Sequence, residues 1–280
     1  MTVGSLLLTI SVVIAGQATQ PATREWKPIG RFDREVIRES SGVVRSRQHD
    51  GIFWTHSDSG NAAEIFAIRA TGELVARVRI DGAVNSDWED LAADKAGFLY
   101  VADIGNNSRL RVQRQVYKFR EPHPFAESPR AQVETTFTVS YADEPFDAEG
   151  LVVYREGLYV VSKSRDKPTQ LYRLVPPDPD HPTRLQPEPL GTVPVSFATG
   201  ADVSASEDKL AVCNGHTLAV FRTEGESPLP GPDAVLGQVW FPHGSIEACG
   251  FDGGDVVLTA ESGQVYRVTT HDLEQRTRFR

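Results

Sequence analysis

Short apolar segments alternate with turn residues along most of this chain, and one combination of them recurs five times. Each copy opens with an acidic or small polar residue, runs into a short apolar strand, and continues through a turn into a second apolar strand. The copies open at Glu39, Asp87, Asp147, Thr199 and Ser245. Their aligned positions, 42, 90, 150, 202 and 248, lie 46 to 60 residues apart. This pattern predicts repeated β units rather than helices.

The second strand of each copy is the clearest, because a turn residue precedes a run of β-branched and aromatic residues. We expect these second strands at residues 51–55, 97–101, 157–161, 209–213 and 255–259. Third strands follow at 64–68, 116–119, 170–174, 218–221 and 264–268. Weaker fourth strands lie near 74–80, 133–141, 190–195 and 235–241. The fifth copy lacks a fourth strand, whereas residues 26–32 have strand character without a repeat of their own.

Four strands in each of five copies predict an all-β fold, a β-propeller with five four-stranded blades. The segment at residues 26–32 would then close the ring as the outer strand of the last blade, which removes an open sheet edge. Six blades are the alternative if the long second copy hides an irregular blade. A β-sandwich with an extra β unit is the alternative to the whole scheme. We expect one propeller domain over residues 25–280.

The N-terminal residues predict export. An apolar run at residues 2–16 is shorter than the roughly 20 residues that span a bilayer, so we interpret residues 1–20 as a signal peptide. The protein is then secreted or periplasmic, with no membrane span after cleavage. Cys213 and Cys249 fall in consecutive repeats, so a disulfide and two buried free thiols are both open.

The charge of the chain limits its partners. The formal net charge is −9, with 38 acidic against 29 basic side chains. A nucleic acid or an anionic membrane surface would be repelled at long range, so we expect no nucleic-acid partner. A cation, a small molecule, a glycan or a protein remains compatible, and we expect a monomer.

Acidic residues recur where a propeller turns side chains toward its central channel. Glu89, Glu149 and Glu247 share one repeat position, and Asp90 and Asp202 lie one step later. Two such charges 4 Å apart repel by about 4 kcal/mol at an effective dielectric near 20. A bound cation, raised pKa values or basic neighbours must compensate, and oxygen-only ligands favour Ca²⁺ over zinc. The simpler alternative is a wide channel in which water solvates these acids.

Polar loops follow the second strands and should gather at one end of the channel. Asp58, Asp103 and Asn107 add oxygen donors there and join the three glutamates as candidate metal ligands. The candidate ligand rim consists of Arg109, Lys163, Asn214, His216 and Glu261. Each loop taken singly is equally compatible with an ordinary strand connection.

The candidate catalytic residues are His56, Glu89 and Glu149. Histidine titrates near neutrality, which suits a general base, yet no recognisable nucleophile motif accompanies His56 or His216. Trp88, next to Glu89, is either a core residue or a platform for a ring-shaped ligand.

Residues 39–42, 58–61, 87–92 and 103–107, with Arg109, resemble a group of uncharacterised secreted bacterial propellers across about residues 35–175. The opening Glu149-Gly-Leu is also similar to esterase-like phytase propellers and to calcium-dependent lactonase propellers of the paraoxonase and gluconolactonase type. This similarity implies a central Ca²⁺ and hydrolysis of an ester, lactone or phosphoester. The ligands carried over are Glu89, Glu149, Asp58, Asp103 and Asn107. Those hydrolases usually have six blades, and the Asn and His pattern of the lactonases is not located in this chain.

Two functions therefore stand side by side. One is a metal-dependent hydrolase of the esterase, phytase or lactonase type, acting at one mouth of the channel. The other is a non-catalytic extracellular binding or scaffold module for a protein or glycan. The fold alone does not separate them.

Overall fold

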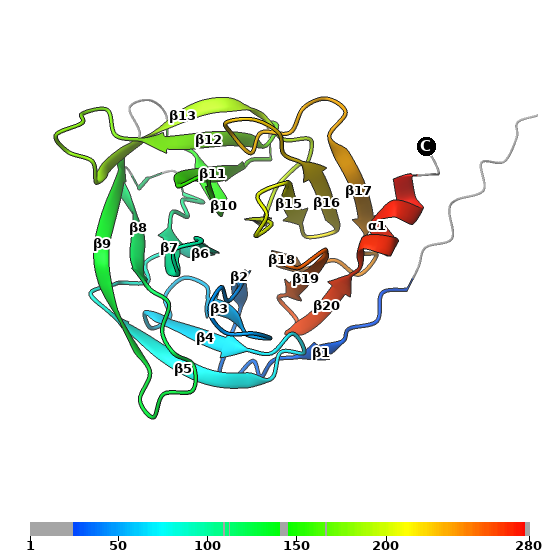
Figure 1. Ribbon diagram of the computed structural model, residues 1–280, viewed down its shortest axis with the longest axis horizontal. Helices are drawn as coiled ribbons and strands as arrows, with labels where there is room; N and C mark the ends of the chain where they lie inside the picture. The colour runs from blue at the N-terminus through cyan, green and yellow to red at the C-terminus, as the bar shows by residue number, and fades with distance from the viewer. Residues whose placement is uncertain (1–24, 109, 112, 141–144, 166, 278–280) are drawn as a thin grey trace, which may run out of the picture.

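The computed structural model describes residues 25–108, 110, 111, 113–140, 145–165 and 167–277. Nearly all of these residues lie in antiparallel β units or in the turns that connect them, arranged around a ring (Figure 1). The protein is a β-propeller, as the repeat predicts. The proposed signal peptide at residues 1–20 and the rim candidate Arg109 fall outside the described residues.

The strands of the described chain pair as five antiparallel groups of four. The first group contains β2 (Ser40–Arg45), β3 (Phe53–Ser57), β4 (Glu64–Ile68) and β5 (Leu74–Asp81). The second contains β6 (Trp88–Ala93), β7 (Phe98–Asp103), β8 (Gln113–Arg120) and β9 (Arg130–Ser140). The third contains β10 (Asp147–Tyr154), β11 (Gly157–Lys163), β12 (Gln170–Val175) and β13 (Arg184–Thr192).

The fourth group contains β14 (Gly200–Val203), β15 (Lys209–Asn214), β16 (Thr217–Arg222) and β17 (Val235–Trp240). The last group joins the two ends of the chain, because β18 (Ile246–Asp252), β19 (Asp255–Ala260) and β20 (Gln264–Val268) are followed in space by β1 (Gly30–Arg31). The pairing expected for the N-terminal segment is thus present, in register Gly30 with Val265. Short parallel pairings also link the outer strands β5, β9 and β13.

The core lies between neighbouring groups rather than within them. Five clusters of buried apolar side chains each combine residues of two adjacent groups, including one between the last group and the first. Trp54 and Trp88 fill the first of these interfaces, and both are fully buried. Trp88 is therefore a core residue and not a platform for a ligand. Cys213 and Cys249 are buried free thiols between the fourth and fifth groups.

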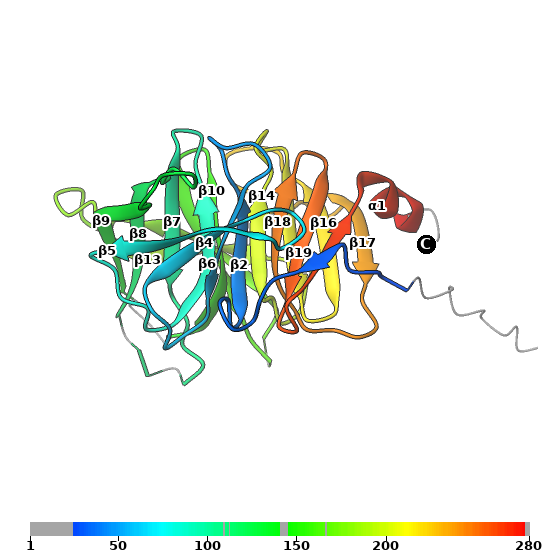
Figure 2. The same ribbon diagram turned by 90° about the horizontal axis from the view of Figure 1, so that it is seen from below.

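The first strands of the groups lie innermost. Strands β2, β6, β10, β14 and β18 contact one another in a circle around the centre, and they run through the thickness of the ring (Figure 2). In four groups the pairing of the first and second strands shifts register at the same repeat position. The residues at these β-bulges are Ser41, Glu89, Glu149 and Glu247. The ladder stays regular at the equivalent Ala201. A β-bulge re-aims a side chain, so these shifts orient the repeated glutamates.

A short helix that the sequence did not suggest ends the described chain. Helix α1 (Thr270–Thr277) packs on β17, where Leu273 lies against Gly237. Thr269 Oγ1 accepts a hydrogen bond from the backbone N–H of Asp272, whose carboxylate accepts the N–H of Thr269 in return. This reciprocal cap explains why a polar tail forms a helix here. Among the described residues, no helix has the length and apolar composition needed to cross a bilayer.

Candidate metal centre

Carboxylates gather where the inner strands β6 and β10 begin. Oxygens of Asp58, Asp87 and Glu89 lie within 4.8 Å of one another, and so do oxygens of Glu89, Asp147 and Glu149. Glu89 belongs to both sets and joins them into one cluster, which we call the acidic mouth. Three of its five members are nearly inaccessible, with exposed fractions of 4% for Glu89, 3% for Glu149 and 7% for Asp147.

Two members of the acidic mouth were not predicted as ligands. Asp87 and Asp147 open their repeats, each two residues before the bulged Glu89 or Glu149. Residues at i and i+2 of a strand point to the same face, so the recurring Asp-x-Glu was a signal that was available in the sequence. The loop residue Asp58 joins them as expected, because its backbone N–H bonds to Glu39 O and holds the loop at the mouth.

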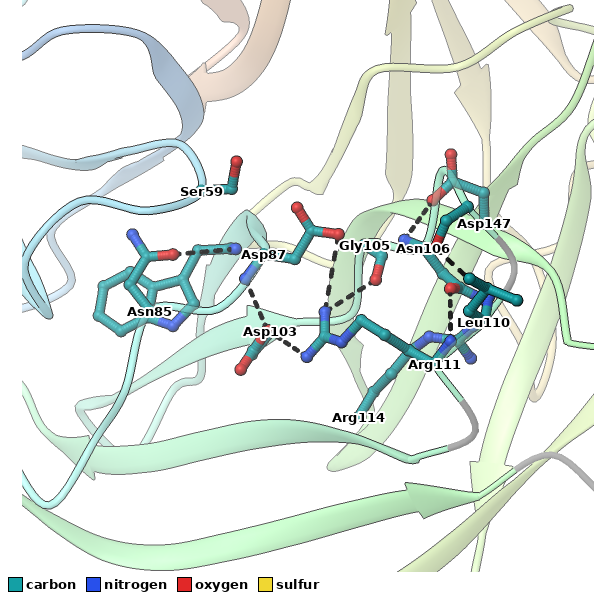
Figure 3. Close-up of polar contacts among 12 residues, drawn as sticks. Ser59, Asn85, Asp87, Asp103, Gly105, Asn106, Leu110, Arg111, Arg114 and Asp147 are labelled. Atoms are coloured by element: carbon teal, nitrogen blue, oxygen red, sulfur yellow. Dashed lines mark hydrogen bonds and ion pairs between the residues drawn. The ribbon is translucent and has the colours of Figure 1, made fainter.

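Arg111 braces one side of the acidic mouth (Figure 3). Its guanidinium donates from Nη2 to Asp103 Oδ1 at 2.7 Å and from Nη1 to the carbonyl of Gly105 at 2.8 Å, and it lies 3.7 Å from Asp87. Asp103 also accepts the backbone N–H of Asp87 at 2.9 Å. Asp103 was a predicted metal ligand, but its carboxylate is engaged by these donors and lies in neither set of converging oxygens. We therefore assign it to positioning Asp87.

The loop after β7 approaches the carboxylates very closely. A side chain at Gly105 would place its Cβ 2.0 Å from Glu89 Oε1 and 2.5 Å from Asp87 Oδ2. The next residue, Asn106, donates its backbone N–H to Asp147 Oδ1 at 2.7 Å. Only glycine fits position 105, and the loop thereby links the two sets of oxygens.

Lys163 pairs with the buried carboxylate of Glu149 in the acidic mouth. Its ammonium lies 2.9 Å from Glu149 Oε1 and 5.0 Å from the ring centroid of Phe197. Burial raises the pKa of Glu149 to about 7, although Lys163 and a hydrogen bond with Glu89 lower it. Burial, followed by the charge of Glu149, raises the pKa of Glu89 well above its usual range. The pair thus holds a proton near neutral pH, when no other cation compensates it.

The second carboxylates of the repeat are structural. Asp90 is 1% exposed and accepts three backbone N–H groups, from Leu91 at 2.8 Å, Leu151 at 2.9 Å and Ala201 at 3.3 Å. Its carboxylate thereby connects β6 with β10 and β14. Asp202 accepts the N–H of Phe251 at 2.8 Å and connects β14 with β18. Both residues hold the inner strands together and leave no oxygen at the mouth.

His56 lies in the core between β3 and β6. Its side chain is fully buried, Nδ1 faces the carbonyl of Ser57 at 3.0 Å, and its ring packs edge-on against Trp88. Burial lowers the pKa of His56 to about 4, so the ring is neutral at pH 7. We assign the proton to Nδ1, which leaves the buried Nε2 without a hydrogen-bond partner. The structure offers His56 no access to a substrate at the mouth.

The predicted metal ligands Glu247 and Asn107 belong to neither set of converging oxygens, and the rim candidates Asn214, His216 and Glu261 lie in different surroundings. Burial raises the pKa of Glu247 to about 7 and Lys163 lowers it, while exposed Glu261 lies close enough to raise it again. Asn214 instead accepts the N–H groups of His216 and Thr217 and so shapes the turn after β15. His216 lies near Trp240, away from the acids. Asn107 is exposed on the loop after β7.

The donor chemistry of the acidic mouth fits a hard divalent cation. Ca²⁺ takes six to eight oxygen ligands at 2.3–2.6 Å, so two ligands of one ion lie at most about 5 Å apart. The 4.8 Å spread of the Asp58, Asp87 and Glu89 oxygens satisfies this limit. No nitrogen or sulfur ligand accompanies them among the described residues, which disfavours zinc.

Comparison with known proteins shows neither a family nor a function for this chain. No protein-family model matches this chain, and a search of curated proteins finds no significant match. Among solved structures, the Cps50 (Swd1) β-propeller domain of Myceliophteria thermophila is 10% identical over 82% of this chain and 97% of that chain, with a TM-score of 0.44. Hydrazine synthase of Kuenenia stuttgartiensis is 11% identical over 82% and 71%, with a TM-score of 0.44. A chain of a nidogen–laminin complex is 13% identical over 83% and 76%, with a TM-score of 0.45.

Proposed function

We propose that this protein binds Ca²⁺ at its acidic mouth and uses the ion to hold an oxygen-bearing ligand. One observation carries the proposal: five carboxylates converge at the acidic mouth. Their oxygens form two sets that share Glu89, and within each set the oxygens lie within 4.8 Å of one another. Only Lys163 and Arg111 form ion pairs with these carboxylates in the described chain. The negative charge therefore exceeds its local compensation, and a divalent cation would balance it.

Of the two sets, Asp58, Asp87 and Glu89 suit the cation better. Lys163 already pairs with Glu149 in the other set, and a second cation there would meet its repulsion. Asp58 and Asp87 are partly exposed, so water or a ligand oxygen can complete the coordination. The ion would lie at the surface of the mouth, with Glu149 and Lys163 behind it.

Hydrolysis of an ester, lactone or phosphoester is the more demanding form of this proposal. A bound Ca²⁺ would polarise a ligand oxygen, which is the chemistry that the ion supplies. Glu149 has a pKa near 7 and lies beside Lys163, so it can accept or return a proton at neutral pH. A non-catalytic module that holds a glycan or protein through the same ion is the second candidate, favoured by the inaccessibility of His56.

Calorimetric titration and thermal unfolding with EGTA, Ca²⁺ and Mg²⁺ test the metal site. At a free Ca²⁺ concentration 100 times Kd, binding to the folded state stabilises it by about 2.7 kcal/mol. We expect this stabilisation in the parent and in the exposed control Glu188→Gln, and its loss in Glu89→Gln and Asp58→Asn. No Ca²⁺-specific shift in the parent, or an equal shift in Glu89→Gln, would contradict the proposal.

A substrate panel then separates the two forms. Aryl esters, lactones and phosphomonoesters are offered to the Ca²⁺-loaded parent and to Glu149→Gln. Turnover that depends on Ca²⁺ and falls at least a hundredfold in Glu149→Gln supports hydrolysis. Ca²⁺-dependent ligand binding without turnover supports the binding module.

A further inference from the structure

The end of the channel opposite the acidic mouth holds a pocket of about 700 Å³, which we call the far pocket. Turns between first and second strands of four groups contribute to it, together with the faces of β7 and β8. Its charged and aromatic lining includes Arg47, Lys95, Phe98, Tyr100, Lys118 and Arg155. A volume of this size suits a small organic molecule, for which pockets of roughly 300–1,000 Å³ are usual.

Several charges of the far pocket are already paired. Lys95 Nζ lies 2.6 Å from Glu207 Oε2, and Arg155 Nη1 lies 3.1 Å from Glu226 Oε1. Asp94 accepts the hydroxyl of Tyr100 at 2.9 Å and the backbone N–H of Phe98 at 2.8 Å. Lys95 and Arg155 are thus paired with carboxylates, whereas Asp94 keeps its negative charge because both of its donors are neutral.

Two cations of the far pocket have no such partner. Within the described ranges, no carboxylate lies within 4.0 Å of the Arg47 guanidinium or of the Lys118 ammonium. Lys118 Nζ is instead held over aromatic rings, 4.1 Å from the centroid of Phe98 and 5.3 Å from that of Tyr100. Burial raises the pKa of Asp202 to about 6, and the positive charge of Arg47 lowers it. Arg47 therefore interacts electrostatically with this buried carboxylate of the channel.

Two carboxylates of the far pocket, Asp94 and Glu156, likewise form no ion pair with a described residue, although Asp94 accepts hydrogen bonds from the Tyr100 hydroxyl and the Phe98 N–H. Over the whole lining, the four basic side chains Arg47, Lys95, Lys118 and Arg155 exceed the three carboxylates Asp94, Glu156 and Glu207 by one, in a chain whose formal net charge is −9. Electrostatic forces would attract an anion to the far pocket and repel it from the acidic mouth.

The turns that line the far pocket are also strained. Arg155, Glu156 and Glu207 have φ angles of 45°, 65° and 57°, a region that side-chain-bearing residues seldom adopt. They are three of the five non-glycine residues with positive φ in the described chain. Such strain persists where the surrounding structure holds a binding surface in shape.

We propose that the far pocket binds a small organic anion that joins an aromatic ring to a phosphate or carboxylate group. The oxyanion would pair with Arg47 and Lys118, which form no ion pair with a carboxylate of the described chain. The ring would pack on the apolar surface formed by Ala93, Phe98, Val153 and Val203. This site is separate from the acidic mouth and does not depend on Ca²⁺.

Calorimetric titration of the protein with phenyl phosphate, in EGTA, tests the proposal. Inorganic phosphate and benzyl alcohol, which each keep one half of the probe, should bind at least tenfold more weakly. Arg47→Gln and Lys118→Gln should each weaken phenyl phosphate binding about tenfold, because each removes one charge-assisted contact. Lys118→Arg should retain binding, and the exposed control Arg184→Gln should bind like the parent.

A variant that keeps both cations guards against indirect effects. Ala205 lines the far pocket and is exposed, so Ala205→Phe should block the probe without touching Arg47 or Lys118. Thermal unfolding of every variant verifies that it folds. The proposal is overturned if phenyl phosphate does not bind, if it binds only with Ca²⁺, or if Arg47→Gln, Lys118→Gln and Ala205→Phe all bind like Arg184→Gln.

Discussion

The two ends of the channel are built from the two ends of the same inner strands, yet acidic side chains dominate one end and basic side chains outnumber acidic ones at the other. At the acidic mouth, bulges at Glu89 and Glu149 gather carboxylates that only Lys163 and Arg111 oppose. At the far pocket, the four basic side chains Arg47, Lys95, Lys118 and Arg155 outnumber the three carboxylates of the lining. The repeat supplies the framework at both ends, and local departures from it supply the chemistry.

A layer of buried aspartates separates these ends. Asp90 and Asp202 occupy the repeat position one step beyond the glutamates, but their oxygens bond to strand N–H groups. One step along a strand thus separates a carboxylate that faces the acidic mouth from one that connects neighbouring inner strands. The channel therefore has three parts, namely the acidic mouth, the layer of buried aspartates and the far pocket, and substitutions can change each one separately.

The largest effect is expected from the middle layer. Asp90→Ala leaves the N–H groups of Leu91, Leu151 and Ala201 without their acceptor, and each unsatisfied buried donor costs about 1–3 kcal/mol. We expect a loss of roughly 3–5 kcal/mol in the free energy of unfolding measured with urea, and impaired binding at both ends. Asp90→Asn keeps one acceptor oxygen and should lose less. A loss below about 1 kcal/mol for Asp90→Ala would show that this layer does not hold the strands.

The next effect concerns the acidic mouth and pH. Burial raises the pKa of Glu149 from 4.5 to about 7, so the folded state binds more protons than the unfolded state between these values. Its contribution is therefore full below pH 4.5 and is lost as pH rises through about 7. In EGTA, the parent should lose about 3 kcal/mol relative to Glu149→Gln between pH 4.5 and pH 8.

Urea unfolding of both proteins at several pH values measures this difference. His56 titrates in both proteins with the opposite effect on stability, so its contribution cancels in the difference between them. Saturating Ca²⁺ should reduce the loss, because a bound cation stabilises the ionised carboxylates. Glu188→Gln, at an exposed position, should follow the parent. A parent that gains stability relative to Glu149→Gln as pH rises would show that Lys163 outweighs burial.

A single lysine at each end provides the third test. Lys163 pairs with Glu149 at 2.9 Å, so Lys163→Met removes a competitor of the metal. We expect Ca²⁺ affinity at pH 8 to rise about tenfold, or about 1.4 kcal/mol. Lys95→Met removes a cation of the far pocket that pairs with Glu207, and it should leave Ca²⁺ affinity unchanged. Weaker Ca²⁺ binding in Lys163→Met would mean that this lysine organises the ligands.

The strands were readable from the sequence because their apolar runs recur regularly. The second strand expected at residues 157–161 is β11 (Gly157–Lys163), and the one expected at 255–259 is β19 (Asp255–Ala260). The repeat also identified Glu89 and Glu149 as neighbours in space, since equivalent positions converge on the ring axis. Apolar periodicity does not indicate helix α1, because its sequence is polar and the helix depends on the cap between Thr269 and Asp272 and on the contact of Leu273 with Gly237.

The finer features of both sites were hidden for a physical reason. The recurring Asp-x-Glu places Asp87 on the same face as Glu89, but a β-bulge depends on the pairing of two strands, so no local pattern indicates that both residues meet the loop residue Asp58. The role of Arg111 depends on the path of a loop that lacks a motif. The far pocket combines residues of four repeats, and its turn at Arg155 and Glu156 lacks the glycine that signals a tight hairpin.

The smallest effect is expected from that hairpin. Glu156 connects β10 to β11 with φ at 65°, a conformation that glycine adopts at little cost and other residues at about 1 kcal/mol or more. Glu156→Gly should therefore raise the free energy of unfolding by about 1 kcal/mol, whereas Glu156→Ala keeps the strain and should not. Both remove the carboxylate that opposes an anion, so both should raise phenyl phosphate affinity two- to threefold while Ca²⁺ affinity stays constant. Equal stability of the two variants would show that the turn is unstrained, and unchanged phenyl phosphate affinity would show that Glu156 lies outside the field of the far pocket.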